Sequence, residues 1–369
     1  MYDNLSIYIH WPFCLSKCNY CDFNSYATTD INEQLWKNAY LRELNFYKAG
    51  VEKKIIKSIY FGGGTPSMMA PSMLDELLDF IYNNYPVDKS VEITLEANPN
   101  TAATMNFSDL KELGINRLSI GVQSFSEENL HFLGRTHSKS EAIDALRAAA
   151  KFFDRYSFDL IYALPNQDVL LWQKELSEAL DYAGGHLSLY QLSVEPNTVF
   201  FKQGVKEAND ELAAELFDFT NDFMAKNNLP AYEISNYATC GQESVHNLTY
   251  WNYGEWVGIG PGAHGRLKSG DCCHAVANFK LPKVWLEKVH GDGWGAETNE
   301  VLTNQDIEKE RIMMGLRLSS GLKKEFFANV EWNKIITMMD NGFLIVKDDN
   351  IKTTSKGRRC LNAVLDYIL

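Results

Sequence analysis

Short apolar runs alternate with longer amphipathic segments through the first 235 residues of the chain. The apolar runs are rich in β-branched and aromatic residues, which predicts strands. The segments between them repeat apolar residues at helical spacing, which predicts helices. The predicted strands are 6–11, 58–61, 91–96, 117–122, 158–162 and 186–192, with 232–235 as a candidate seventh. The predicted helices are 30–50, 70–85, 105–113, 138–153, 172–182 and 210–227.

This order of elements predicts an α/β fold. A strand, a helix and a further strand in sequence make a parallel sheet with right-handed crossovers. Residues 1–235 fit a partial (β/α)6 barrel of TIM-like architecture, and an open doubly wound sheet is the alternative. In both architectures the functional groups gather at the carboxyl ends of the strands. We therefore expect polar residues along one rim and apolar residues inside the strands.

The remaining residues predict a connecting segment over 236–300 and a smaller C-terminal domain over 301–369. The domain has predicted helices at 306–318, 331–341 and 355–369 and a β-hairpin at 342–354. Helices followed by a small β wing resemble a winged-helix module. The acidic chain and its short basic stretch argue against DNA binding. We interpret the domain as a docking or lid element over the barrel rim.

Charge and cysteine usage narrow the class of protein. The chain has 35 basic and 48 acidic residues, a net charge of −13, which argues against nucleic acid as the main partner. Its seven cysteines are an odd number with three clustered, which is typical of a reducing compartment and not of a disulfide framework. The sequence shows no signal peptide and no long apolar run. We expect a cytoplasmic protein, with peripheral contact at the inner membrane face left open.

The clustered cysteines, Cys14, Cys18 and Cys21, follow the first predicted strand with the spacing C-x3-C-x2-C. Thiolates in one short loop suit a soft metal centre. Three of them hold three irons of a [4Fe–4S] cluster and leave the fourth iron open to a substrate or cofactor. A zinc site is the alternative, but zinc normally takes four ligands and no fourth Cys or His lies nearby at finger spacing.

Polar groups and glycines follow the later strands. Gly62, Gly63 and Gly64 expose backbone groups to close approach, or make only a turn. The run lacks the Lys-Ser/Thr ending of a P-loop. Glu96 follows an apolar strand and is a candidate rim group, with a solvated carboxylate as the alternative. Asp159 lies inside its strand, where burial with a hydrogen-bonding partner competes with a ligand role.

The cysteine spacing resembles that of the radical S-adenosylmethionine (SAM) superfamily. In that superfamily the open iron chelates the amino and carboxylate groups of SAM, and one electron cleaves a C–S bond to give a deoxyadenosyl radical. Further stretches resemble the oxygen-independent coproporphyrinogen III oxidase family: Tyr-Ile-His-x-Pro-Phe-Cys, Phe-Gly-Gly-Gly-Thr-Pro-Ser, Glu-Ala-Asn-Pro, Gly-Val-Gln-Ser-Phe, Gly-Arg-Thr-His and Asp-Leu-Ile-Tyr-x-Leu-Pro. The resemblance implies SAM contacts at Tyr8, Tyr20, Gly63, Gly64, Thr65, Glu96, Gln123, Arg135 and Asp159, with weaker support for Gln191.

Two features depart from the oxidase. That family has a further cysteine at the position of Phe23, and it has a longer stretch before the first strand. Both features resemble the HemW branch, whose members are haem chaperones that pass haem to membrane-bound respiratory haem proteins. The stretch His246-Asn247-Leu248-Thr249-Tyr250-Trp251 resembles the haem-binding motif of that branch, which implies that His246 binds haem. A structural role for this histidine is the alternative reading.

Two other groups are weaker candidates for metal or haem ligation, namely His264 and the run Cys272-Cys273-His274. The predicted function is a haem chaperone that binds a [4Fe–4S] cluster, SAM and haem, without a named catalytic residue. The alternatives are an oxygen-independent coproporphyrinogen III oxidase or another radical SAM oxidoreductase. The haem acceptor, the cleavage of SAM and a homodimeric state stay open.

Overall fold

The computed structural model describes residues 3–102 and 107–369. Within these residues the main sheet has eleven strands in the order β13-β12-β11-β10-β1-β4-β5-β6-β7-β8-β9. The strands from β10 to β8 in this order run parallel to one another. They are β10 (Trp256–Ile259), β1 (Asp3–Trp11), β4 (Lys54–Gly63), β5 (Val87–Ala97), β6 (Arg117–Gln123), β7 (Arg155–Tyr162) and β8 (His186–Gln191). The predicted α/β class and the six predicted strands are confirmed.

The seventh parallel strand is not the predicted one. Residues 232–235 form bends, and the short β9 (Asn236–Ala238) after them runs antiparallel to β8. The seventh parallel strand, β10, comes instead from the glycine-rich stretch. A Cβ on Gly258 would lie 2.2 Å from the carbonyl oxygen of His264, so only glycine permits this close chain approach. The sheet then continues antiparallel through β11 (His264–Ser269), β12 (Cys272–Asn278) and β13 (Ala296–Leu302).

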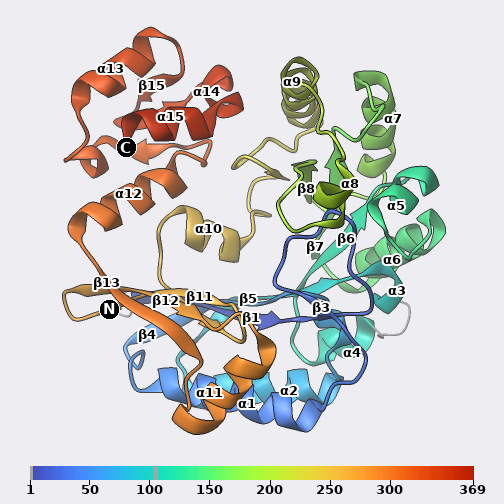
Figure 1. Ribbon diagram of the computed structural model, residues 1–369, viewed down its shortest axis with the longest axis vertical. Helices are drawn as coiled ribbons and strands as arrows, with labels where there is room; N and C mark the ends of the chain where they lie inside the picture. The colour runs from blue at the N-terminus through green and yellow to red at the C-terminus, as the bar shows by residue number, and fades with distance from the viewer. Residues whose placement is uncertain (1–2, 103–106) are drawn as a thin grey trace.

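Helices cover the apolar face of this sheet, and Figure 1 shows α1, α2 and α11 side by side along it. The predicted helix 105–113 begins at residues outside the described ranges, and α4 is its described part. None of the helices in the described ranges has the length and apolar character needed to cross a bilayer. The helices up to residue 292 are α1 (Glu33–Lys48), α2 (Pro71–Asn84), α3 (Pro99–Ala102), α4 (Phe107–Glu112), α5 (Glu127–Leu133), α6 (Lys139–Phe152), α7 (Val169–Leu180), α8 (Val199–Gln203), α9 (Asp210–Lys226), α10 (Val245–Trp251) and α11 (Pro282–Asp292).

The strand interiors are apolar on one face only, so our expectation of wholly apolar strands is wrong. In β1, Leu5, Ile7 and Ile9 are at most 1% exposed and belong to the main hydrophobic core. The alternate residues of the strands point to the opposite face, because side chains in a strand alternate. These alternate residues are polar and buried: Ser6, Ser58, Glu92, Thr94, Arg117, Ser119, Ser157, His186 and Ser188. The parallel sheet therefore has an apolar face under the helices and a polar inner face.

Residues after β13 form a separate hydrophobic core of their own. The predicted hairpin is confirmed: β15 (Leu344–Lys347) and β16 (Asn350–Thr353) join through Asp348 and Asp349, both at positive φ. The predicted last helix breaks at Cys360 into two. The other elements are α12 (Asn304–Gly315), β14 (Leu322–Lys323), η2 (Lys324–Phe327), α13 (Trp332–Asp340), α14 (Ser355–Arg359) and α15 (Leu361–Ile368).

The C-terminal domain docks beside α10, as Figure 1 shows. Arg266 forms an ion pair with Glu310 of α12 at 2.7 Å, and the Tyr253 hydroxyl donates to the same carboxylate at 2.7 Å. The Arg317 guanidinium lies over the Trp251 ring, 5.8 Å from its centroid. The end of α10 is thereby fixed against this domain.

Candidate functional site

The polar inner face of the parallel strands lines a cavity of about 390 Å³. The lining contains all three clustered cysteines and most of the residues that the family resemblance implies for SAM. These residues come from the segments after β1, β4 and α5, from the carboxyl ends of β4, β5 and β6, and from β7 and β8. The chain thus brings distant motifs together at one place. The predicted residues in the lining are Cys14, Cys18, Tyr20, Cys21, Gly63, Gly64, Thr65, Glu96, Gln123, Arg135, Asp159 and Gln191.

The cysteine loop is tied to the glycine run beside it. The strand β2 (Phe13–Cys14) pairs with β3 (Tyr26–Ala27), which closes the loop around Cys18 and Cys21. The Thr65 backbone N–H donates to the Phe13 carbonyl at 2.8 Å. A Cβ on Gly64 would lie 2.6 Å from the same carbonyl oxygen, so a side chain there would push the loop away. The glycine is thus needed for the loop to pack here.

The three clustered thiols lie in different local surroundings. Cys14 is 9% exposed, and burial raises the pKa of its thiol, as it does for Cys21. The Arg135 guanidinium donates to the Cys18 sulfur at 3.3 Å. Within residues 3–102 and 107–369, no three Cys, His, Asp or Glu side chains form a group that could hold one metal ion.

Glu96 lies beside the glycine run and is held at one orientation. Its carboxylate accepts the Gly63 backbone N–H at 3.0 Å and the Tyr60 hydroxyl at 2.9 Å. Burial and, to a smaller extent, the nearby Asp159 raise the pKa of this carboxyl to about 7. A buried carboxylate at the cavity wall is a natural partner for an ammonium group.

Gln123 and Arg135 meet where β6 ends. Gln123 has a φ of 70°, a conformation that residues other than glycine rarely adopt. Local strain of this kind is typical of functional sites. The Arg135 guanidinium donates to the Gly121 carbonyl at 2.6 Å and to the Asn98 side chain at 3.0 Å. Both side chains are therefore fixed toward the cavity by backbone geometry and by hydrogen bonds.

Asp159 lies on the inner face of β7 and lines the cavity. Burial raises the pKa of its carboxyl to about 6, although Ser188 and two arginines lower it. Our sequence reasoning did not single out several other polar residues of the lining, among them Tyr60, Arg117 and Ser119. These three alternate with apolar residues along their strands, and this period-two pattern is the signal that could have revealed them.

Tyr8 and His246 lie outside the cavity lining. The Tyr8 hydroxyl hydrogen-bonds His10 Nδ1 at 3.0 Å, and its ring lies near that of His246, with centroids 6.1 Å apart. His246 is 1% exposed and stacks on Tyr60. Its Nδ1 hydrogen-bonds Ser58 at 2.8 Å, and its Nε2 hydrogen-bonds the Tyr250 hydroxyl at 2.7 Å. Both ring nitrogens are therefore occupied, and burial lowers the pKa of the imidazole to about 3.

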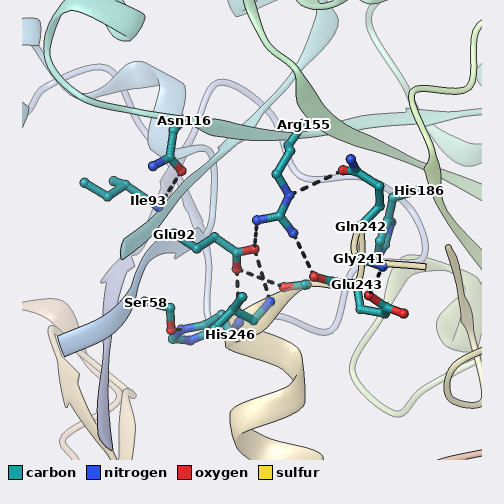
Figure 2. Close-up of polar contacts among 12 residues, drawn as sticks. Ser58, Glu92, Ile93, Asn116, Arg155, His186, Gly241, Gln242, Glu243 and His246 are labelled. Carbon is teal, nitrogen blue, oxygen red and sulfur yellow. Dashed lines mark hydrogen bonds and ion pairs between the residues drawn. The ribbon is translucent and has the colours of Figure 1, made fainter. Parts of the chain in front are cut away.

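The helix α10 that carries His246 is anchored to the inner face of the sheet by one carboxylate, which Figure 2 shows. Glu92 of β5 accepts the backbone N–H groups of Val245 and His246 at 3.1 and 3.0 Å. It also pairs with Arg155 at 2.8 Å, and that guanidinium donates to the Glu243 carbonyl at 2.7 Å. A carboxylate at a helix N-terminus satisfies backbone donors that otherwise have no partner. The segment 243–246 is thereby fixed in position.

The weaker candidate ligands lie elsewhere. His264 begins β11 with an exposed side chain, and its backbone carbonyl accepts the Trp256 indole N–H at 2.9 Å. Cys272 is exposed on β12, Cys273 is buried, and His274 hydrogen-bonds Asn299 at 3.0 Å. None of these residues lines the cavity.

Comparison with known proteins agrees with this arrangement. Residues 8–170 match the family model of the radical SAM superfamily, and residues 302–360 match that of the HemN C-terminal domain. The solved structure of coproporphyrinogen III oxidase (HemN) from Escherichia coli superposes with a TM-score of 0.84 at 20% identity, covering 99% of this chain and 90% of that one. The fold and the three-cysteine cavity thus define a radical SAM protein.

Curated relatives narrow the family. Heme chaperone HemW from Escherichia coli is 39% identical over 99% of this chain and 98% of its own length. The protein of that name from Haemophilus influenzae is 33% identical, with the same shares covered. The mitochondrial radical S-adenosyl methionine domain-containing protein 1 of Danio rerio is 33% identical over 99% of this chain and 86% of its own length. The chain belongs to the HemW family.

Proposed function

We propose that this protein is a haem chaperone that holds a [4Fe–4S] cluster and SAM in the cavity and delivers haem to respiratory proteins at the membrane. One observation carries the cofactor part: the three cysteines and nine further predicted residues line a single cavity. The relatives named heme chaperones, at 33–39% identity over nearly the whole chain, support the haem part.

The residues fit the two cofactors. Cys14, Cys18 and Cys21 would hold three irons, and the cluster would supply an open coordination position and a single electron. Glu96 is positioned to accept an ammonium group beside the glycine run, since it already accepts the Gly63 N–H. Arg135 places a cation next to Cys18, to whose sulfur it donates a hydrogen bond. Asp159 and Gln123 supply further polar groups to the same cavity.

We propose His246 as the haem ligand. Its Nε2 must then leave the Tyr250 hydroxyl, because a metal ligand needs a free lone pair. The low pKa keeps the ring neutral, which is the form that binds iron. Glu92 holds the first turn of α10 in place, so we expect the opening to involve the Tyr250 side of the helix.

The test is a haem titration of anaerobically reconstituted protein, followed at the Soret band, with His246→Ala beside the wild type. Saturable binding that the variant weakens at least tenfold, with an unchanged fold by circular dichroism, is the expected result. Equal affinity of the two proteins would reassign the ligand. Absence of binding to both would remove the main support for a chaperone.

A second assay separates the chaperone from the oxidase. Phe23, where the oxidase family has a cysteine, lines the cavity with a side chain that is 61% exposed. We expect anaerobic incubation with reductant, SAM and coproporphyrinogen III to yield no protoporphyrinogen IX. Efficient turnover would restore the oxidase as the function.

A further inference from the structure

Arg117 is a buried cation that has no hydrogen-bond or ion-pair partner in the part of the chain that the structure describes. It begins β6, is 3% exposed and lines the cavity. Its side chain takes part in none of the hydrogen bonds and ion pairs found among the described residues. The other arginine of the lining, Arg135, differs in this respect, because it donates to Cys18, Asn98 and Gly121.

Arg117 lies at the amino end of β6, whereas the cysteine loop follows the carboxyl end of the parallel strand β1. Arg117 precedes Gln123 by six residues on the same strand, a separation of about 20 Å in an extended chain. Its charge acts on Asp159 and Tyr60, whose pKa values it lowers. It also acts on the two buried histidines His186 and His246. Asp159 lines the same cavity, and no ion pair joins it to Arg117 among the described residues.

An unpaired guanidinium at this depth is unfavourable for the folded protein. Burial of a charge without a partner disfavours the folded state, even after relaxation and water penetration. The planar fork of arginine matches a carboxylate with two parallel hydrogen bonds. Stability is often given up in this way where a ligand supplies the missing partner.

We infer that Arg117 forms a carboxylate-binding subsite in the cavity, for a ligand other than the methionine part of SAM. Under the proposed function that methionine part binds at the cluster loop, too far from Arg117 for one small molecule to place its carboxylate at both. Haem carries two propionate groups. Under the proposed function, one of these carboxylates is the ligand of Arg117. The assignment to a propionate rests on the proposed function, and the subsite itself does not.

The first experiment measures haem and haem dimethyl ester binding to reconstituted wild type and to Arg117→Gln. The wild type is expected to bind haem about 10- to 100-fold more tightly than the ester, the usual range for a hydrogen-bonded charge. The variant is expected to lose that preference and to keep its affinity for SAM. A variant with reduced SAM affinity and an intact preference for haem over the ester would overturn the inference.

The second experiment does not need haem. Sodium propionate is expected to raise the unfolding temperature of the wild type more than propionamide does, and the difference is expected to vanish in Arg117→Gln. Equal effects of the two compounds on the wild type would exclude the subsite. Absence of haem binding together with a propionate effect would leave the subsite in place and reject the chaperone proposal.

A matched pair of variants distinguishes a ligand site from a structural arginine. Without ligand, Arg117→Gln is expected to unfold at the same or a higher temperature than the wild type, because it removes an unpaired charge. Arg135→Gln, the same change in the same cavity, is expected to unfold at a lower temperature, since it removes three bonds. A similar loss in both variants would show that Arg117 is structural.

Discussion

The cysteine loop and the helix α10 carry the two most specific motifs of the chain. The two motifs differ in how accessible their side chains are. The cysteines line an open cavity together with Glu96 and Gln123. His246 of α10 is buried, and both of its ring nitrogens are bonded. Under the proposed function, the cysteine motif is open to its ligand, whereas the motif on α10 must first open. The difference lies in hydrogen-bond partners, which a motif does not encode.

The largest effect is expected from a substitution in the cysteine loop. Cys18→Ala should lose the cluster, because a three-cysteine site has no spare ligand within the loop. Iron content and the broad visible absorption of the reconstituted protein measure this. Cys272→Ala, an exposed cysteine away from the cavity, is the matched control and should keep its iron. Retention of four irons per chain in Cys18→Ala would contradict the cluster assignment.

The next largest effect is expected at the anchor of helix α10. Glu92→Gln removes the charge that pairs with Arg155 and caps α10. We expect a loss of about 2–4 kcal/mol in the free energy of unfolding, less than for a fully buried pair because the arginine is partly exposed. Urea unfolding measures it. Glu287→Gln, in an exposed pair with Lys283, should change stability little. Equal losses in the two variants would show that Glu92 is not an anchor.

We expect acid to lower the free energy of unfolding, because buried neutral histidines lie around α10. The pKa of His246 is lowered to about 3, and burial also places that of His186 well below its ordinary value of 6.5. Below pH 6.5 the unfolded chain binds protons that the folded chain does not, so stability falls as the pH falls from 6.5 toward 3. Each histidine adds at most about 1.4 kcal/mol per pH unit. His246→Gln should reduce the slope of unfolding free energy against pH between 6 and 4, and an unchanged slope would show that this ring is protonated in the native state.

The smallest effect concerns Glu96 and the pH dependence of SAM affinity. Because the pKa of Glu96 is about 7, its charged fraction rises between pH 6 and pH 8. If the carboxylate binds the SAM ammonium group, SAM affinity should rise by up to about tenfold over this range. Glu96→Gln should bind SAM weakly at both pH values. Equilibrium dialysis checks this, and a pH-independent affinity in the wild type would place the ammonium group elsewhere.

The sequence predicts the fold and the cavity well, because both depend on local patterns. Six strands and the convergence of Cys14, Glu96 and Asp159 follow from short apolar runs and from the rule that parallel strands end at one edge. The seventh parallel strand was missed, since β10 is only four residues long and contains Gly258. β10 pairs with β1, which lies far from it in the sequence, and no local sequence pattern predicts such a pairing.

The surroundings of His246 could not be predicted for a similar reason. Ser58, which hydrogen-bonds the His246 ring, lies 188 residues away in the sequence. Glu92, which accepts the His246 backbone N–H, lies 154 residues away. Arg117 was missed although its strand alternates, because we expected the strand interiors to be apolar. Polar residues that alternate with apolar ones along a buried strand are the clue to a polar inner face of the sheet.

The most direct test of the contrast between the two sites is the haem affinity of Tyr250→Phe. The substitution removes the hydroxyl that occupies His246 Nε2 and keeps the aromatic ring. We expect Tyr250→Phe to bind haem more tightly than the wild type, and His246→Ala to bind it more weakly than either. Equal haem affinity of Tyr250→Phe and the wild type would contradict the account, because it would mean that the bond closing His246 does not limit haem binding.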